Sequence, residues 1–451
     1  MDDTVVILEL SKININDDKS RPIILSTSLI YEIFEYIHDD YKLLIHQEDM
    51  KDEERSKRLS IELIMRSGLE DYFKDVLLSR RFKYDLCTEA AKRGYVSTLK
   101  WAKKHGCDWD PKTCEAAASA GHLDCLKWVR ENGCRWSLRT CRAAALKGHL
   151  DCLKWARENG CHWNSTTCDA AAERGHLDCL IWAREHGCEW TSDTCMHAAG
   201  GGHLDCLIWA CKNGCEWDRS TCEAAALGGY LDCLQWARER GCDWNFETPR
   251  LAAKNGHLHC LIWAREHGCE WNAETCMHAA AGGHFGCLKW AREHGCQWDS
   301  RVCSVATLGG HLDCLKWARE HGCDWTTQIC EIAAAGGHLD CLMWAREHGC
   351  EWTSEAICYA AGGGHLDCLK WAREHGCGWD RRTCIAAAGG GHLDCLMWSV
   401  KHFAPFDLNE CKKLARLYKY QDMLDWFSSI ESIATILKQC YVIKMMRDVE
   451  Y

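Results

Sequence analysis

The sequence predicts an all-α solenoid of about twelve helix-turn-helix repeats with helical caps. The main observation is a strict period, because a Trp recurs every 27 residues, without insertion or deletion, at 101, 128, 155, 182, 209, 236, 263, 290, 317, 344, 371 and 398. Such a period is typical of one small unit stacked many times. Each unit also holds two short helix patterns separated by glycine turns. The array is expected over residues 86–409.

The first helix of a unit is predicted from an Ala-rich stretch such as residues 113–120, TCEAAASA, which Gly121 ends. Thr113 is suited to the N-cap position of this helix. The residue after the loop Trp, Ser137 in the next unit, is Asp, Asn, Ser or Thr in all twelve copies from Asp110 to Asp407. We expect this residue to start a turn or to cap the next first helix.

The second helix is predicted over residues 123–132, LDCLKWVREN. Its apolar stripe consists of Leu123, Cys125, Leu126, Trp128 and Val129. Gly133 supplies the left-handed position after the helix, and the Asn or His before it suits the negative end of the helix dipole. We expect the Trp rows, next to small Cys and Ala side chains, to interdigitate between repeats and to bury ~150–250 Å² per ring.

The chain contains 36 Cys, which recur at three positions of the unit, as in Cys114, Cys125 and Cys134. Equivalent positions lie one repeat apart, and packed helices stand ~8–10 Å apart, whereas a disulfide needs Cα atoms within about 7 Å. We therefore expect reduced thiols that act as small buried apolar side chains.

Chemistry at these residues is the alternative to packing. His-x-x-Cys, as in His122 and Cys125, and His-Gly-Cys, as in His375 and Cys377, contain donors that zinc accepts, although no Cys-x-x-Cys occurs. A nucleophilic Cys must be distinctive and lie beside a base, whereas these residues are copied from unit to unit. The sequence predicts no catalysis and no cofactor, and a metal-storing Cys/His array stays as an alternative.

Charge and hydropathy argue against several kinds of partner. The formal net charge is −11 and the pI is about 6.1, which argues against phosphate binding and therefore against nucleic acid. No stretch reaches ~18 uncharged apolar residues, and the acidic opening MDDTVVILELSKININDD does not fit a signal peptide. We expect a soluble, cytoplasmic protein with no membrane partner.

The units resemble ankyrin repeats. The family pattern TPLHxAAxxGHLEIVKLLLxxGADVN is matched by TCMHAAAGGHFGCLKWAREHGCQWD at 275–299, and Thr-Cys-Met-His also begins at Thr194. The unit has 27 residues rather than the family's ~33, so the hairpin is expected to be shortened or lost, and Trp and Cys replace family Leu, Ile and Val. Trp- and Cys-rich arrays of this style resemble ankyrin-like proteins of large DNA viruses and their protist hosts.

Comparison of the copies indicates where binding could lie. The second helix is nearly constant, whereas the first helix varies at two adjacent positions. One position carries Glu115, Arg142, Asp169, Met196, Glu223, Arg250, Met277, Ser304, Glu331, Cys358 and Ile385. The next position adds His197, Leu251, His278, Val305, Ile332 and Tyr359, which we name the recognition row. The resemblance implies that the first helix and the loop before it form the concave binding surface; drift on a solvated face is the alternative.

The residue before the loop Trp adds a charge pattern. It is acidic in seven of eleven copies, at Asp108, Glu189, Glu216, Asp243, Glu270, Asp324 and Glu351. Such a row would favour a basic partner, or it is simply a solvated edge. The sequence as a whole predicts a non-catalytic scaffold that binds another protein.

The flanks are expected to be caps: a helical segment at 1–60, a capping helix at 61–85, and a degenerate repeat with a closing helix at 410–451. Residues 25–37, LSTSLIYEIFEYI, resemble the start of an F-box, the module that docks on the Skp adaptor of a ubiquitin ligase. The residues on that pattern are Leu25, Leu29, Ile30, Ile33 and Phe34. The usual Pro, acid and downstream Trp are missing, so a plain capping helix and a ubiquitin-ligase substrate adaptor both stay open.

Overall fold

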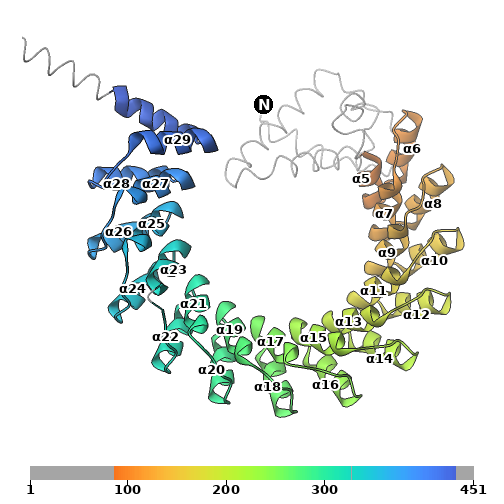
Figure 1. Ribbon diagram of the computed structural model, residues 1–451. Helices are drawn as coiled ribbons and strands as arrows, with labels where there is room; N and C mark the ends of the chain where they lie inside the picture. Colours follow the sequence, from red (N-terminus) through yellow and green to blue (C-terminus); the bar gives the residue numbers. More distant parts are fainter. Residues whose placement is uncertain (1–85, 327, 433–451) are drawn as a thin grey trace, which may run out of the picture. The chain divides into compact units, whose positions relative to one another are not determined.

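The computed structural model describes residues 86–326 and 328–432, and in these ranges every regular element is an α-helix (Figure 1). The all-α prediction is confirmed. The chain divides into two compact units between Trp109 and Asp110. The described part of the first unit holds one helix pair, α5 (Leu86–Arg93) and α6 (Val96–Lys104). The second unit holds the remaining pairs.

In the second unit, a first and a second helix alternate in every repeat. The first helices are α7 (Pro111–Ala120), α9 (Leu138–Leu146), α11 (Ser165–Glu173), α13 (Ser192–Gly200), α15 (Arg219–Gly228), α17 (Glu247–Lys254), α19 (Ala273–Ala281), α21 (Arg301–Leu308), α23 (Ile329–Gly336), α25 (Ser354–Gly362), α27 (Arg381–Gly390) and α29 (Leu408–Tyr418). The second helices are α8 (Leu123–Glu131), α10 (Leu150–Glu158), α12 (Leu177–Glu185), α14 (Leu204–Lys212), α16 (Leu231–Glu239), α18 (Leu258–Glu266), α20 (Phe285–Glu293), α22 (Leu312–Glu320), α24 (Leu339–Glu347), α26 (Leu366–Glu374) and α28 (Leu393–Lys401).

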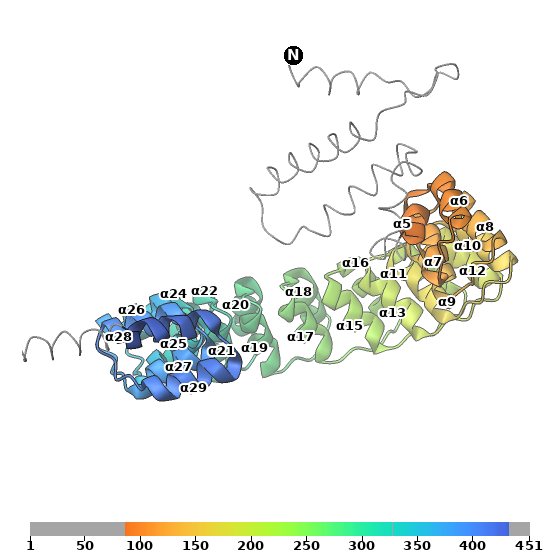
Figure 2. The same cartoon turned by 90° about the horizontal axis from the view of Figure 1, so that it is seen from above.

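The two kinds of helix form two separate rows along the stack (Figures 1 and 2). Consecutive first helices pack closely against one another, whereas consecutive second helices touch far less. Each second helix packs mainly on the first helix of its own repeat. The first helices therefore carry most of the contact between repeats.

Most first helices begin directly after the polar residue that follows the loop Trp, whereas α17, α21 and α23 start one or two residues later. Asp110 has an extended backbone, and its side chain accepts a hydrogen bond of 2.9 Å from the backbone N–H of Lys112. The equivalent bond, from the N–H two residues on, is accepted by Ser137, Thr191, Asp218, Asn245, Asn272, Asp299, Thr353 and Asp380. Asp407 instead accepts from the N–H of Glu410, three residues on. The expected N-cap role of Thr113 is wrong, because α7 already starts at Pro111 and Thr113 is buried in its first turn.

The core consists of small side chains and one large one per repeat. Ala117, Ala118 and Cys114 of the first helix and Leu126 of the second are fully buried, and their equivalents repeat this pattern along the stack. The expectation that the Trp rings fill the space between repeats needs correction. The second-helix Trp side chains are half-buried, and only Trp317 and Trp344 fall below a tenth exposed, at 8% and 9%.

The Trp side chains instead form a layered stack near the surface. Trp163, in the loop before α11, meets Trp182 of α12 edge to face, with ring centroids 5.7 Å apart. The guanidinium of Arg157 lies over the Trp163 ring at 4.5 Å, and His186 stacks on Trp182 at 4.3 Å. The rings are arranged as aromatic pairs and cation–π contacts prefer. Because each Arg reaches the loop Trp of the next repeat, these contacts link the repeats in series.

The cysteines are packed as expected. All described Cys are free thiols, and all except Cys211 are buried. Burial raises the pKa of Cys260 to about 11, so its thiol stays protonated at neutral pH. The loop Cys also makes a contact, because the Cys134 thiol donates to the backbone carbonyl of Asp110 at 3.2 Å. This thiol row therefore ties together consecutive loops.

In most repeats, a His side chain also packs against a glycine of the preceding repeat. Gly310 has φ +73°, and an added Cβ there would lie 2.5 Å from Nδ1 of His338 in the next repeat. The His338 Nε2 lies 2.9 Å from the backbone carbonyl oxygen of Leu308. A glycine is thus required by both the backbone conformation and the approaching ring.

At the C-terminal end, α29 and the helical residues 421–432 form a further pair. Cys411 and Ala415 are buried as in the other repeats, and Tyr420 takes the place of the His, with its hydroxyl donating to Gly389 O at 3.3 Å. The F-box-like stretch, the segments 1–60 and 61–85 and most of the closing helix at 429–446 lie outside the described residues. Among the described residues, no helix is long and apolar enough to cross a membrane.

Candidate protein-binding surface

The first of the two variable positions is largely engaged in contacts between repeats. The Thr194 hydroxyl donates to Asp169 Oδ1 at 2.6 Å, and the Thr353 hydroxyl donates to Glu331 Oε1 at 2.6 Å. Glu115 accepts in the same way from Ser137. Burial raises the pKa of Asp169, although Thr194 opposes the shift. Variation at this position therefore changes how neighbouring repeats are joined.

The second variable position holds the recognition row. His197 on α13, Leu251 on α17, His278 on α19, Val305 on α21 and Ile332 on α23 are half-buried. Tyr359 on α25 is the most open member, with 49% of its surface exposed. From Leu251 to Tyr359, these residues occupy equivalent positions on the consecutive first helices α17, α19, α21, α23 and α25. His197 stands apart, because Ala224 of α15 separates it from Leu251.

His278 is held by the neighbouring helix. Arg250 of α17 donates through Nη1 to His278 Nε2 at 3.1 Å, while its Nε donates to Glu247 Oε2 at 2.9 Å. Burial and the positive charge of Arg250 lower the pKa of His278. The imidazole is therefore neutral at pH 7, with Nε2 as the acceptor, and it is fixed in one orientation on the surface.

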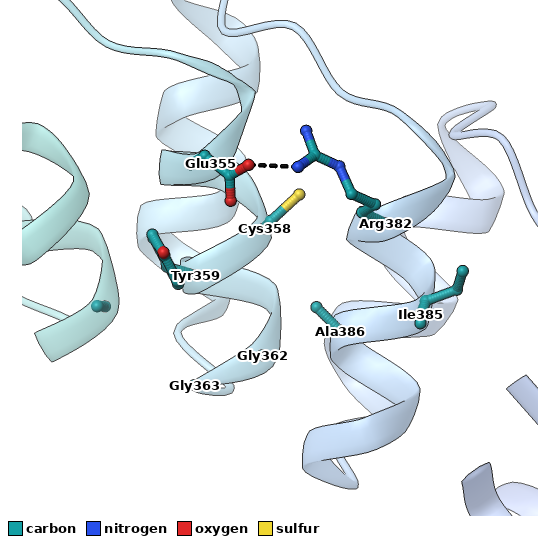
Figure 3. A pocket seen from close by; sticks show the side chains of 9 residues that line it. Glu355, Cys358, Tyr359, Gly362, Gly363, Arg382, Ile385 and Ala386 are labelled. Carbon is teal, nitrogen blue, oxygen red and sulfur yellow. Dashed lines mark hydrogen bonds and ion pairs between the residues drawn. The ribbon is translucent and has the colours of Figure 1, made fainter.

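An open hollow lies beside Tyr359, between α25 and α27 (Figure 3). Its volume is about 490 Å³, and Cys358 and Ile385 contribute to its apolar lining. Glu355 and Arg382 form an ion pair across its rim, as the dashed line in Figure 3 marks. Arg382 also donates to Ser354 Oγ at 3.1 Å. The hollow therefore combines an apolar lining with a charged edge.

Two further side chains on this surface were not identified from the sequence. Leu308 on α21 is 63% exposed and Leu227 on α15 is 46% exposed. Leu308 follows Val305 by three residues, so the two side chains lie on the same face of the helix. That helical spacing is the signal that would have found them. With them, the surface from α15 to α27 becomes more apolar than the recognition row alone.

The Cys/His donors do not converge on a common point. The Gly-His imidazoles pack on the preceding repeat, as His257 does with Nε2 3.1 Å from the carbonyl oxygen of Leu227, whereas the Cys side chains lie in the core. Within the part of the chain that the structure describes, no group of three or more His, Cys, Asp or Glu side chains is placed to hold a metal ion. The metal-storing alternative therefore gains no support from the described residues.

The repeats are similar to parts of known proteins. Residues 141–184, which run from α9 to α12, match the family model described as ankyrin repeats (many copies). No curated protein matches the chain. The human ASB11 ankyrin repeat domain aligns at 21% identity and TM-score 0.31, over 35% of this chain and 84% of that one. The pentatricopeptide repeat protein PPR10, solved in complex with an 18-nt psaJ RNA element, aligns at 14% identity and TM-score 0.36, over 84% of this chain and 67% of that one.

The match to the family model covers parts of two consecutive repeats of a pattern that recurs, with the same 27-residue period, along the array. Each repeat is a helix pair, and a left-handed glycine follows most of the helices, as at Gly121 and Gly133, whereas Phe403 and Lys419 take this position after α28 and α29. The resemblance to ankyrin repeats seen in the sequence is confirmed at residues 141–184, where the chain matches the ankyrin-repeat family model.

Proposed function

We propose that the array is a non-catalytic scaffold that binds another protein through the recognition row and the apolar side chains beside it. One observation carries this proposal: along the first helices the constant Cys and Ala side chains are buried in the stack, whereas the recognition row varies and stays accessible. Aromatic side chains on such a surface are frequent hot spots of protein binding, which makes Tyr359 its main candidate anchor.

The character of the surface favours a protein over other ligands. The side chains lie on consecutive helices ~10 Å apart, so together they offer a long and shallow contact. They are mainly apolar, with the Glu355–Arg382 pair at one edge. A partner segment that presents apolar side chains at intervals would fit this arrangement, because apolar burial drives most protein association.

The test compares two variants of the full chain in quantitative pull-downs. The row variant combines Leu251→Ala, His278→Ala, Ile332→Ala and Tyr359→Ala. Ala already occupies this position in other copies, as at Ala116, Ala143, Ala170, Ala224 and Ala386, so the fold should tolerate it. The row variant should lose a partner that the wild type retains, with unchanged helical circular dichroism.

The matched control removes four apolar side chains from the second helices, by Ile208→Ala, Ile262→Ala, Met343→Ala and Met397→Ala. These positions lie on the other row of helices, so this variant should keep the partner. Equal retention of every bound protein by the wild type and the row variant would refute the proposed site.

A further inference from the structure

Cys211 departs from the repeat pattern. The equivalent residue is Arg130, Arg157, Arg184, Arg238, Arg265, Arg292, Arg319, Arg346 or Arg373 in other repeats. Those arginines cover the following loop Trp, as Arg184 does over Trp190 at 4.3 Å and Arg238 does over Trp244 at 4.5 Å. A thiol cannot make this contact, so the substitution leaves a smaller, uncharged side chain at one point of the aromatic stack.

Three thiols meet at this place. The Sγ atoms of Cys195 on α13 and Cys211 on α14 lie 3.5 Å apart, and Cys195 is also hydrogen-bonded to Cys215. Cys211 is the one described Cys that is not buried. Cys215 is 6% exposed, against 0% for Cys188 and 2% for Cys242 at the equivalent positions. The loss of the Arg therefore opens the thiol cluster toward solvent.

We propose that Cys211 and Cys195 are a redox modification site, where a hydroperoxide converts the two thiols into a reversible disulfide. The two Sγ atoms are already in contact at 3.5 Å, and a disulfide requires them to approach to ~2.05 Å. Equivalent Cys195-type residues in other repeats face only buried thiols, so this site differs from the rest of the array.

The reaction proceeds in two balanced steps. The accessible Cys211, as its thiolate, attacks one oxygen of hydrogen peroxide, which gives a sulfenic acid and releases hydroxide that takes up the thiol's proton as water. The Cys195 sulfur then attacks the Cys211 sulfur and displaces the hydroxyl, which leaves as water with the Cys195 proton. Overall, two thiols lose two electrons and two protons, and one peroxide becomes two waters.

The order of the steps follows from the environments of the two thiols. Hydrogen bonding to Cys211 and burial raise the pKa of Cys195, so this thiol stays protonated and is shielded from the oxidant. Cys211 is reached first, and Cys195 is the resolving thiol. The product would join the two helices of one repeat next to His197, which follows Cys195 by two residues on α13. The site does not depend on the proposed partner binding.

The experiment treats the reduced full chain with hydrogen peroxide, alkylates the remaining thiols in denaturant, and maps the peptides by mass spectrometry without reduction. The peptides of Cys195 and Cys211 should appear as one disulfide-linked species, with loss of alkylation at both, and dithiothreitol should restore both thiols. The buried pair Cys222 and Cys242 serves as the internal control and should stay alkylated.

Two variants make the assignment specific. Cys211→Arg should abolish the linked species and leave the melting temperature at least as high, because it restores the residue of the other repeats. Arg238→Cys creates the same arrangement one repeat later and should add a second disulfide, to Cys222. Full alkylation of Cys195 and Cys211 after peroxide, or the same disulfides in wild type and Cys211→Arg, would overturn the proposal.

Discussion

At the scale of single residues, two apolar side chains of the second helix, a Leu and a Trp, contribute differently to stability. Leu234 is fully buried, whereas Trp236 is half-buried against Trp217, with ring centroids 5.4 Å apart. Leu234 is therefore a core residue, whereas Trp236 makes its aromatic contact near the surface, although Trp is the larger side chain.

This difference predicts the order of two substitutions. Leu234→Ala should cost about 2–5 kcal/mol, because it leaves a cavity in the core. Trp236→Ala should cost only about 1–2 kcal/mol, from the lost aromatic pair and part of its buried area. Urea denaturation followed by circular dichroism measures both. A larger loss for Trp236→Ala would mean that the Trp rings, and not the Leu row, hold the repeats together.

His278 predicts a pH dependence. Burial, Arg250 and Lys254 lower its pKa, and Glu247 and Glu274 oppose the shift. The folded chain therefore takes up this proton at lower pH than the unfolded chain. The His278 contribution to stability is complete above the ordinary His pKa of 6.5 and is lost as the pH falls below it, through the lowered folded value.

Proton NMR titration of the imidazole measures this directly. The His278 midpoint should lie below 6.5, and Arg250→Ala should move it upward, because one of the two main causes of the shift is removed. A wild-type midpoint above 6.5 would mean that the Arg250 contact is absent in solution.

At the scale of the helix pair, a comparison of two glycines distinguishes the cost of the backbone conformation from the cost of lost packing. Gly310 and Gly322 both have positive φ, +73° and +80°, but an added Cβ would meet the His338 ring only at Gly310; at Gly322 nothing lies within 4 Å. Both Ala substitutions pay the left-handed cost of ~1–2 kcal/mol. Gly310→Ala should lower the melting temperature clearly more, because it also displaces His338. Equal losses would show that the His row does not join the repeats.

The sequence predicted the elements of this fold well because their signals are local. The 27-residue period, the glycine after each helix and the polar cap at Asp110 all act within a few residues. The N-cap prediction for Thr113 was wrong because Asp110, three residues earlier, is also suited to cap the helix. Asp110 has the extended backbone of an N-cap residue, whereas Thr113 already lies within α7. Such competition is decided by geometry, which composition does not reveal.

The candidate surface was less predictable, because its contacts join residues about 25 apart. Variation alone marked two adjacent first-helix positions, but the Thr194–Asp169 bond occupies the first and leaves the second accessible. The edge-to-face pair of Trp163 and Trp182 likewise joins a loop to a helix 19 residues further along the chain. Side-chain partners across repeats require the structure.

At the scale of the whole molecule, binding should be spread along the stack. Leu251 and Tyr359 are four repeats apart, since 108 residues separate them and the period is 27. Sites so distant act independently. Leu251→Ala and Tyr359→Ala should each weaken the affinity for the captured partner, and the double variant should show the sum of both free-energy changes, measured by calorimetry. An effect of the double variant equal to either single one would confine binding to one end.

The central claim is that the accessible row of the first helices contacts the partner. The most direct measurement places a photo-crosslinking amino acid at Tyr359 of α25, and in a separate sample at Met397 of α28, which is similarly exposed at 42% against 49%. Irradiation of the captured complex and peptide mapping then identify the contact. We expect crosslinks to the partner from position 359 and none from position 397. Crosslinks from position 397 alone would place binding on the second helices and contradict it.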